Sequence, residues 1–132
     1  MPSKKPTVSS LKKKLWKIVS EYIRRKYSDW KGDVKCFTCG RQYHWKQIQA
    51  GHFIGGRHNA ILYDERNIRP QCYGCNVMKH GDQLNYYRKL VAIHGEKYVK
   101  ELERLDKTTK QFTVNELIEL IDLYTAKLHK LE

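Results

Sequence analysis

No long apolar run occurs in the 132 residues of this chain. A helix that crosses a bilayer needs about 20 consecutive apolar residues, and the sequence has no such stretch. The segment from Met1 to Lys14 also lacks the uninterrupted hydrophobic core of a secretory signal peptide. These absences exclude a membrane-spanning protein and predict an intracellular one with no membrane partner.

Hydrophobic residues are also in short supply, at 40% of the chain, and there is no internal repeat or low-complexity segment. A chain of this length fits one domain, and its hydrophobic core is necessarily limited. A bound structural metal would supplement such a core.

Acidic residues are scarce in the first quarter of the chain. Residues 1–31 contain ten Lys or Arg residues against only Glu21 and Asp29, a net charge of +8. Residues 32–81 add +4, whereas residues 82–132 balance nine basic against nine acidic residues. This asymmetry predicts a face that binds a polyanion near the N-terminus. A solvated basic helix that only aids solubility is the alternative.

The four cysteines form two pairs with the same spacing. They are Cys36-Phe37-Thr38-Cys39 and Cys72-Tyr73-Gly74-Cys75. Two tight turns that each offer two thiolates match a tetrahedral zinc site. Thiols stay reduced inside cells, which favours zinc over disulfides. We therefore predict one structural Zn²⁺ per chain, bound by Cys36, Cys39, Cys72 and Cys75.

Hydrophobic spacing predicts an α+β fold that is mostly helical. Residues 1–8 are expected to form a basic disordered tail, and residues 9–31 an amphipathic basic helix capped by Ser9 or Ser10 and ending between Asp29 and Gly32. Trp16 and Trp30 are assigned to the core by default, with a subunit interface as the alternative.

The central region, residues 34–81, should contain the metal-binding turns. We expect a first zinc turn over 34–41, a bent hairpin or two short strands over 43–54, and a loop over 55–59. Residues 61–68 should be extended or irregular, and a helix should begin at or near Cys75.

Residues 82–132 are expected to form a neutral helical scaffold. Asp82 is the expected N-cap of a helix that reaches about Ile93 and stops at Gly95. A second helix covers 96–105, and the capping box from Thr113 to Glu116 predicts a third. The apolar side of the first of these helices is predicted to contain Leu84, Tyr87, Leu90 and Val91.

His52 and Asn76 are the candidate catalytic residues. His52 lies between the cysteine pairs, and Asn76 directly follows the last cysteine. A histidine of near-neutral pKa can take a proton from water, and one divalent cation can bind both a scissile phosphate and its leaving oxygen. The alternative for His52 is a packed strand histidine.

The order Cys-x-x-Cys, strand His, Cys-x-x-Cys-Asn resembles the ββα-metal nucleases (HNH, or His-Me finger), in particular the zinc-containing endonuclease VII type. The similarity is closer to the phage NinG, or Rap, recombination proteins. Its carriers are Gln49 to Ile54, Asp64-x-x-Asn67 and Gln71-Cys72-x-x-Cys75-Asn76, followed by Gly81, Tyr87, Leu90 and Gly95. The resemblance is good over residues 34–96 and weak through the last helix.

This resemblance implies a zinc-stapled ββα-metal core within a single nuclease domain, residues 9–132. It implies that His52 is the general base, that Asn76 binds catalytic Mg²⁺ or Mn²⁺, and that Asn67 ties down the loop and helps orient His52. The implied protein is a homodimeric endonuclease of phage or prophage recombination. It would cut branched DNA such as Holliday junctions in the cytoplasm of the bacterial host.

One position departs from the family pattern, and several roles stay open. Many HNH enzymes carry an aspartate or histidine just before the base, where this chain has Gly51. His80 is either a second metal ligand or a surface histidine. Asp64 either orients the site or caps a local turn, and Arg57 either clamps the phosphate or makes an ordinary backbone contact. The expected DNA contacts are Lys12, Lys13, Lys17, Arg24, Arg25, Arg57 and Lys79.

Two other functions fit the same residues. A non-catalytic zinc module could bind DNA or recruit recombination proteins, and Gly51 is the best support for it. A homing-type or restriction-like enzyme would cut linear duplexes in a sequence-dependent way.

Overall fold

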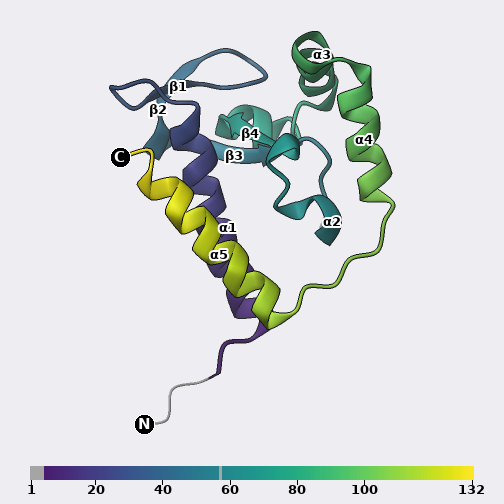
Figure 1. Ribbon diagram of the computed structural model, residues 1–132. Coiled ribbons are helices and arrows are strands. Elements are labelled where there is room, and N and C mark those ends of the chain that lie inside the picture. The colour runs from purple at the N-terminus through teal and green to yellow at the C-terminus, as the bar shows by residue number, and fades with distance from the viewer. Residues whose placement is uncertain (1–4, 57) are drawn as a thin grey trace.

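The computed structural model describes residues 5–56 and 58–132 and shows a mixed α+β architecture that is mostly helical, as predicted (Figure 1). The first and last helices, α1 (Val8–Lys26) and α5 (Val114–His129), lie side by side. A second pair consists of α3 (Gln83–His94) and α4 (Glu96–Asp106). Two small antiparallel sheets lie between the pairs. Within the described residues, no helix has the length and apolar character needed to span a bilayer.

Helix α1 begins one residue earlier than predicted and ends sooner. Its N-cap is Thr7, which forms a capping box with Ser10, so the cap is neither Ser9 nor Ser10. The predicted tail therefore contributes its last residues to the helix, and residues 1–4 lie outside the described part. The helix stops at Lys26 because Asp29 Oδ1 accepts the N–H groups of Lys31 and Asp33 and forms a turn.

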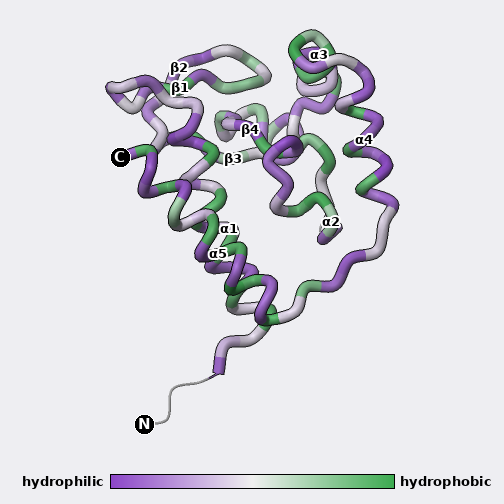
Figure 2. The backbone as a smooth tube through the Cα atoms, in the orientation of Figure 1, coloured by the Kyte–Doolittle hydropathy of each residue, from purple (hydrophilic) through white to green (hydrophobic). Residues whose placement is uncertain are grey.

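The main core lies between α1 and α5. Leu15, Val19 and Ile23 on α1 are completely buried and belong to one cluster with Leu117 and Ile121 on α5. Figure 2 shows hydrophobic residues alternating with hydrophilic ones along these helices, as expected of amphipathic elements. The capping box predicted at Thr113 and Glu116 is present and starts α5 at Val114. The α1–α5 pair thus forms a rigid base for the centre of the chain.

The region predicted as a bent hairpin or two short strands, residues 43–54, contains two short strands and not a hairpin. Strand β1 (Asp33–Lys35) pairs with β2 (Gln42–His44), and β3 (Gln49–His52) pairs with β4 (Ile68–Gln71). A 3₁₀ turn over Trp45–Gln47 separates β2 from β3, and Trp45 N–H donates to Gly32 O, so each strand finds its partner elsewhere.

In the β3–β4 pair, Gln49 faces Gln71 and His52 faces Ile68. The segment between the two strands is more regular than predicted, with the short helix α2 (Asn59–Leu62) and a 3₁₀ turn over Glu65–Asn67. The two paired strands hold the ends of this connecting segment together, and His52 is the last residue before the segment begins.

A short π-helical turn, Gly74–Met78, follows β4, close to the helix start predicted at Cys75. It ends quickly because His80, Gly81 and Asp82 all have positive φ. These residues turn the chain into α3, which stops at Gly95 (φ 89°) as predicted. Asp82 precedes the helix as predicted, but its carboxylate accepts from the Asn85 side chain and does not cap the backbone.

The buried face of α3 agrees with the prediction at Leu90, which is completely buried, and at Val91, which packs against the same cluster, but not at Leu84 and Tyr87. Tyr86 is fully buried, whereas Leu84 is 60% exposed and Tyr87 is mostly on the surface. The Tyr86 hydroxyl donates to Gly51 O over 2.7 Å, and its ring packs beside Phe53. A buried tyrosine needs a hydrogen-bond partner, and the backbone of β3 provides it.

The two tryptophans assigned to the core have different positions. Trp16 is half-buried and packs against the main core. Trp30 is 89% exposed, so its assignment to the core is wrong. The early end of α1 explains the difference, because Trp30 belongs to the turn that follows the helix and no longer shares its buried stripe.

Candidate active site and metal centre

The four cysteine thiols converge at one point. Cys36 and Cys39 come from the turn after β1, Cys72 follows β4, and Cys75 lies in the π-helical turn. All four sulfur atoms lie within 4.8 Å of one another, and Cys39 Sγ is 3.8 Å from Cys72 Sγ. A tetrahedral site with Zn–S distances of about 2.3 Å has S···S edges of about 3.8 Å. The cluster can therefore hold a zinc ion, as the spacing predicted.

The thiols of this cluster do not ionise alike. Burial alone raises the pKa of Cys36, but the Thr38 hydroxyl and nearby backbone N–H groups donate to its sulfur and lower the pKa to about 6. Burial raises the pKa of Cys75 to about 12. A divalent cation would favour the thiolate form of every member, because its charge offsets the cost of burying them.

His52 lies at the end of β3 with one ring nitrogen engaged. Its Nε2 is 2.9 Å from Leu62 O. A carbonyl oxygen can only accept, so Nε2 carries the proton and Nδ1 keeps a free lone pair. Burial lowers the pKa of His52, while the bond to Leu62 opposes that shift. The imidazole is therefore held neutral and in one tautomer.

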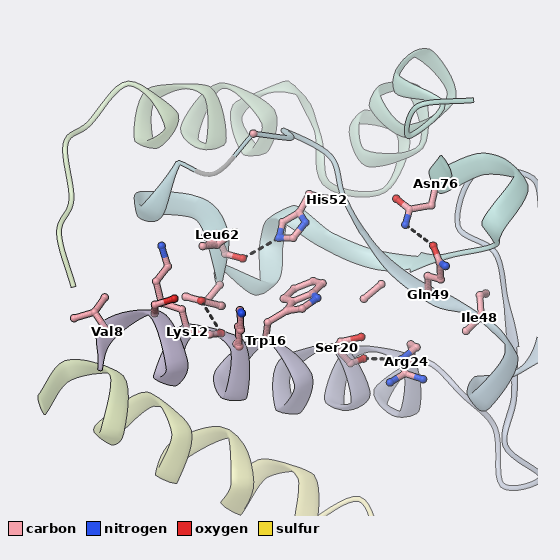
Figure 3. Close-up of a pocket in the computed structure, with 15 residues that line it drawn as sticks. Val8, Lys12, Trp16, Ser20, Arg24, Ile48, Gln49, His52, Leu62 and Asn76 are labelled. Atoms are coloured by element: carbon pink, nitrogen blue, oxygen red, sulfur yellow. Dashed lines mark hydrogen bonds between the residues drawn. The ribbon is translucent and has the colours of Figure 1, made fainter. Parts of the chain in front are cut away.

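Trp16 supports the same imidazole from below. The two ring centroids are 4.7 Å apart and the planes differ by 25°, so the rings are stacked. Figure 3 shows Trp16 rising from α1 towards His52 on β3. Sequence reasoning assigned Trp16 to the core by default and did not connect it with His52, because nothing in the helical spacing points to that strand.

Asn67 is fully buried beside the strand that carries His52. Its Oδ1 accepts Ile54 N–H over 2.8 Å, and its Nδ2 donates to Ile54 O over 3.1 Å. Its backbone carbonyl also accepts Phe53 N–H. One side chain thus satisfies both backbone groups of Ile54 and holds the chain that leaves β3.

Asn76 and His52 line the same cleft, which has a volume of about 1040 Å³. Figure 3 shows α1 along one side of this cleft and β3 and the Asn76 turn on the other. Asn76 Nδ2 donates to Gln49 Oε1 over 2.8 Å. The amide is thereby oriented so that Nδ2 faces Gln49 and Oδ1 is left to accept.

Gly51 lies between these two residues, and no side chain fits there. A Cβ atom at position 51 would lie 1.9 Å from Gln71 Oε1 and 2.9 Å from Asn76 Oδ1. The structure therefore explains why this chain has glycine where many HNH enzymes have an aspartate or histidine, because the Gln71 side chain occupies the space that such a side chain would need.

Gln71 is a residue of this site that the sequence analysis named among the carriers of the resemblance but to which it gave no role. Its Nε2 donates to Gly81 O over 2.8 Å and to Thr38 Oγ1 over 3.1 Å. Its Oε1 is buried and has no hydrogen-bond partner among the described residues. The available signal was its position, because an amide side chain directly before Cys72 ends a strand that is buried throughout.

The residues predicted to contact DNA divide into those that line the cleft and those that do not. Lys12, Lys13 and Arg24 line the cleft, and Arg24 Nη1 donates to Trp45 O. Lys17 and Lys79 are exposed and do not line it. Arg25 likewise lies outside the cleft and pairs with Glu21 and Glu132. Arg57 lies outside the described residues. The predicted DNA-contacting residues are thus only partly gathered around His52 and Asn76.

Two further candidates lie away from the cleft. His80 is exposed and has φ 51°, because the helical turn that contains Asn76 ends at Met78 and does not continue to position 80. Asp64 accepts Arg66 N–H and pairs with the Arg66 guanidinium. It caps the 3₁₀ turn over Glu65–Asn67, which was the alternative considered for it.

Comparison with known proteins gives one family. The family model described as "Bacteriophage Lambda NinG protein" matches residues 3–132. The chain is 32% identical over 100 residues to Protein ninG of Escherichia phage 933W, an alignment that covers 75% of this chain and 49% of the relative. It is 30% identical to Protein ninG of Escherichia phage lambda (75% and 48% covered) and 32% identical to that of Salmonella phage P22 (75% and 48% covered). These alignments span about half the length of the curated relatives. No solved structure matches.

Proposed function

The chain belongs to the NinG family, and we propose from this premise that it is a metal-dependent endonuclease that cuts DNA in phage or prophage recombination. The proposed substrate is branched DNA such as a Holliday junction, and the proposed place of action is the cytoplasm of the bacterial host. One observation carries the proposal. A single cleft is lined by a neutral imidazole, an oriented amide and cationic side chains of α1.

His52 is the general base in this proposal. Nδ1 has a free lone pair because Nε2 donates to Leu62 O, and the lowered pKa keeps the ring unprotonated near pH 7. Nδ1 takes a proton from water, and the oxygen of that water attacks the phosphorus. The bond between phosphorus and the 3′ oxygen breaks, which leaves a 5′-phosphate and a 3′-hydroxyl. Trp16 and Leu62 hold the imidazole in place for this step.

Asn76 is the proposed ligand of the catalytic metal. When bound, Mg²⁺ or Mn²⁺ supplies positive charge to the scissile phosphate and to the leaving oxygen. The donor set fits a hard cation, because Asn76 Oδ1 and Gln71 Oε1 both lie within 2.9 Å of the position that a Cβ would take at residue 51, and Gln71 Oε1 has no hydrogen-bond partner among the described residues. Gln49 keeps the amide of Asn76 turned so that its oxygen is available.

The zinc has a structural role in this proposal. Cys75 and Asn76 are adjacent, so a metal that fixes the thiolate of Cys75 also fixes the backbone that presents the amide of Asn76. The same metal would connect this turn to the segment after β1 through Cys36 and Cys39. Catalytic and structural metals thus act on neighbouring residues.

A homodimer is proposed because symmetric cutting of a junction needs two active sites. The outer face of α3 could provide the contact, since Leu84 (60% exposed) and Ile93 (62% exposed) are large apolar side chains on the surface. Light scattering of the wild type and of Leu84→Lys tests this. A monomeric mass for the wild type would refute the dimer without affecting the chemistry proposed for His52.

Cleavage of a labelled four-way junction tests the proposed activity. The wild type should cut with Mg²⁺ or Mn²⁺ and should not cut in EDTA. His52→Ala and Asn76→Ala should each lose at least about 100-fold in rate, as expected when a general base or a charge-stabilising group is removed. His129→Ala, at an exposed histidine on α5, is the matched control and should cut normally. Cleavage by His52→Ala at the wild-type rate would reject His52 as the base.

A non-catalytic zinc module that binds DNA is the second candidate, and Gly51 favours it, because position 51 supplies no side-chain ligand. Junction binding without cutting in Mg²⁺, Mn²⁺, Co²⁺ or Ni²⁺ would support this candidate. A library of linear duplexes separates both readings from a sequence-specific enzyme, which would cut only particular sequences.

The salt dependence of binding tests the role of α1. Each lost phosphate contact should reduce the slope of log affinity against log salt by about 1. Lys12→Ala and Lys13→Ala, which remove cleft residues, should each lower the slope, whereas Lys107→Ala, at an exposed lysine that does not line the cleft, should not. Equal slopes for all three variants would mean that neither Lys12 nor Lys13 contacts a phosphate of the DNA.

A further inference from the structure

A second concave surface lies at the C-terminal end of α1. Its volume is about 440 Å³, and it is lined by the turn after α1 and by residues around Trp45. Trp30, at its edge, is 89% exposed and is the most exposed large hydrophobic side chain among residues 5–56 and 58–132. Such exposure of a tryptophan is unusual and often indicates a binding surface.

Cations surround the aromatic rings of this surface. Lys31 Nζ lies 5.2 Å from the centroid of the Trp30 ring. The Trp45 ring has Arg25 Cζ at 5.1 Å and Lys46 Nζ at 5.7 Å. Each distance is within the range of cation–π attraction. The rings and the positive charges are therefore presented together.

The charges of this surface are only partly neutralised. Arg25 pairs with Glu21 and Glu132, and Lys26 with Glu65. Lys31 and Lys46 form no ion pair within the described residues. Asp29, the acidic residue lining the cavity, uses Oδ1 to accept two backbone N–H groups of its own turn. Two ammonium groups with no ion-pair partner among the described residues thus lie beside the exposed Trp30 ring and the half-buried Trp45 ring.

We propose that Trp30, Lys31, Trp45 and Lys46, here called the tryptophan surface, bind a single-stranded segment of DNA. Unpaired bases stack on the exposed face of Trp30, and the ammonium groups of Lys31 and Lys46 contact phosphates. Aromatic platforms within a positively charged groove are the usual means of holding single strands, because every base has a π-face. A protein partner fits less well, since lysine is depleted at protein interfaces.

The tryptophan surface adjoins the cleft of His52. Arg24 lines the cleft, and its guanidinium donates to Trp45 O over 2.9 Å. Along α1, Trp16 and Lys26 are separated by about 15 Å at 1.5 Å per residue. Figure 1 shows β1 and β2 at this end of the helix, beside the end of α5. An unpaired strand that leaves the cleft along α1 therefore reaches Trp30.

This inference rests on the proposed function only in that both concern DNA, and it is tested by binding alone. The probe is a fluorescein-labelled 12-nucleotide oligothymidylate, titrated with the zinc-loaded full chain in buffer without Mg²⁺. Trp30→Ala should weaken binding between about 5-fold and 150-fold, the range that base–aromatic stacking gives. Trp30→Phe, which keeps a stacking ring, should retain most of the affinity, and a 12-base-pair duplex should bind both variants within about 2-fold of the wild type.

Two further measurements complete the test, a comparison of two lysine variants and the oligomeric mass of Trp30→Ala. Lys31→Ala should weaken binding to the oligonucleotide more than Lys107→Ala, the control lysine. Unchanged affinity of Trp30→Ala for the oligonucleotide would overturn the inference. So would a change in oligomeric mass caused by Trp30→Ala, because the surface would then join two copies of the chain. Loss of binding by Trp30→Ala supports it even if the wild type cuts no DNA, so the two proposals fail separately.

Discussion

The cysteine cluster and the environment of His52 are built in different ways, although His52 lies in the sequence between the two cysteine pairs. The cluster consists of four identical groups whose sulfurs lie within 4.8 Å of one another. His52 is held by groups of different kinds, a carbonyl from Leu62 and an indole from Trp16. Four cysteines that can bind a metal are recognised in the sequence by their regular spacing. The partners that position the imidazole, Leu62 and Trp16, belong to no motif and cannot be recognised in this way.

The two regions should therefore respond differently to the loss of one member. Removing one cysteine from the cluster should affect all four, because a bound metal would join them. Removing one partner of His52 leaves the others in place. The following predictions test this contrast, beginning with the largest expected effect.

Zinc removal should have the largest effect. A structural zinc site contributes folding free energy directly, on the order of 10 kcal/mol in small zinc domains. Cys75→Ser, at a buried thiol, should abolish zinc binding and the cooperative thermal transition of the central region, measured by calorimetry with a colorimetric zinc assay. Cys39→Ser, at an exposed thiol where water can replace the sulfur, should keep part of the affinity. Equal losses from both substitutions would contradict the contrast between buried and exposed ligands.

A side chain at position 51 should have the next largest effect. Gly51→Asp, which introduces a carboxylate at this position, should destabilise the protein by about 1–3 kcal/mol, because its Cβ would overlap Gln71 Oε1. Urea unfolding measures the loss. In a Gln71→Ala background the penalty should shrink. Gly55→Ala is the matched control, since no atom lies within 4 Å of its Cβ position.

Loss of one hydroxyl behind β3 should have a smaller effect. Tyr86→Phe removes the buried hydrogen bond to Gly51 O and should cost about 1 kcal/mol in the free energy of unfolding. Tyr87→Phe, at the neighbouring exposed position, should change stability by less than half of that. A larger cost for Tyr87 would mean that the buried face of α3 is the one predicted from the sequence.

The smallest effect should come from the indole beneath His52. Trp16→Leu keeps apolar packing but admits solvent, so the pKa of His52 should rise from its lowered position. Burial lowers this pKa in the folded protein. The contribution of the neutral imidazole to the free energy of unfolding is therefore fully present above pH about 6.5 and is lost as the pH falls below that value. Proton NMR of the imidazole across pH 4–8 measures the shift, with the His129 signal as internal reference. An unchanged titration would show that the indole does not shield the ring.

Local signals predicted the features that depend on neighbours in the sequence. The Cys-x-x-Cys spacing predicted the metal cluster, and the Thr113–Glu116 box predicted the start of α5. Gly95 ended α3 where expected, because a helix commonly stops at a glycine with positive φ. These devices act over three or four residues, and their chemistry is contained in the residues themselves.

Features that depend on distant segments were not predictable in the same way. Strands β2 and β3 each pair outside the region where a hairpin was expected. The buried tyrosine of α3 is Tyr86 and not Tyr87, since the choice depends on Gly51 O across the molecule. The pattern that contains Gln71 does not indicate a role for its side chain, which appears only when Gly51, Asn76 and Thr38 are seen around it.

The pairing of α1 with α5 has a consequence for the order of synthesis. A ribosome makes α1 first and α5 more than eighty residues later, so the part of the α1 stripe that packs against Leu117 and Ile121 stays uncovered until α5 has emerged. Ala50 and Ile68, from the central strands, emerge earlier and cover only another part of this stripe. The wall of the cleft that holds Trp16 is therefore fully packed only after translation has passed Val114–His129.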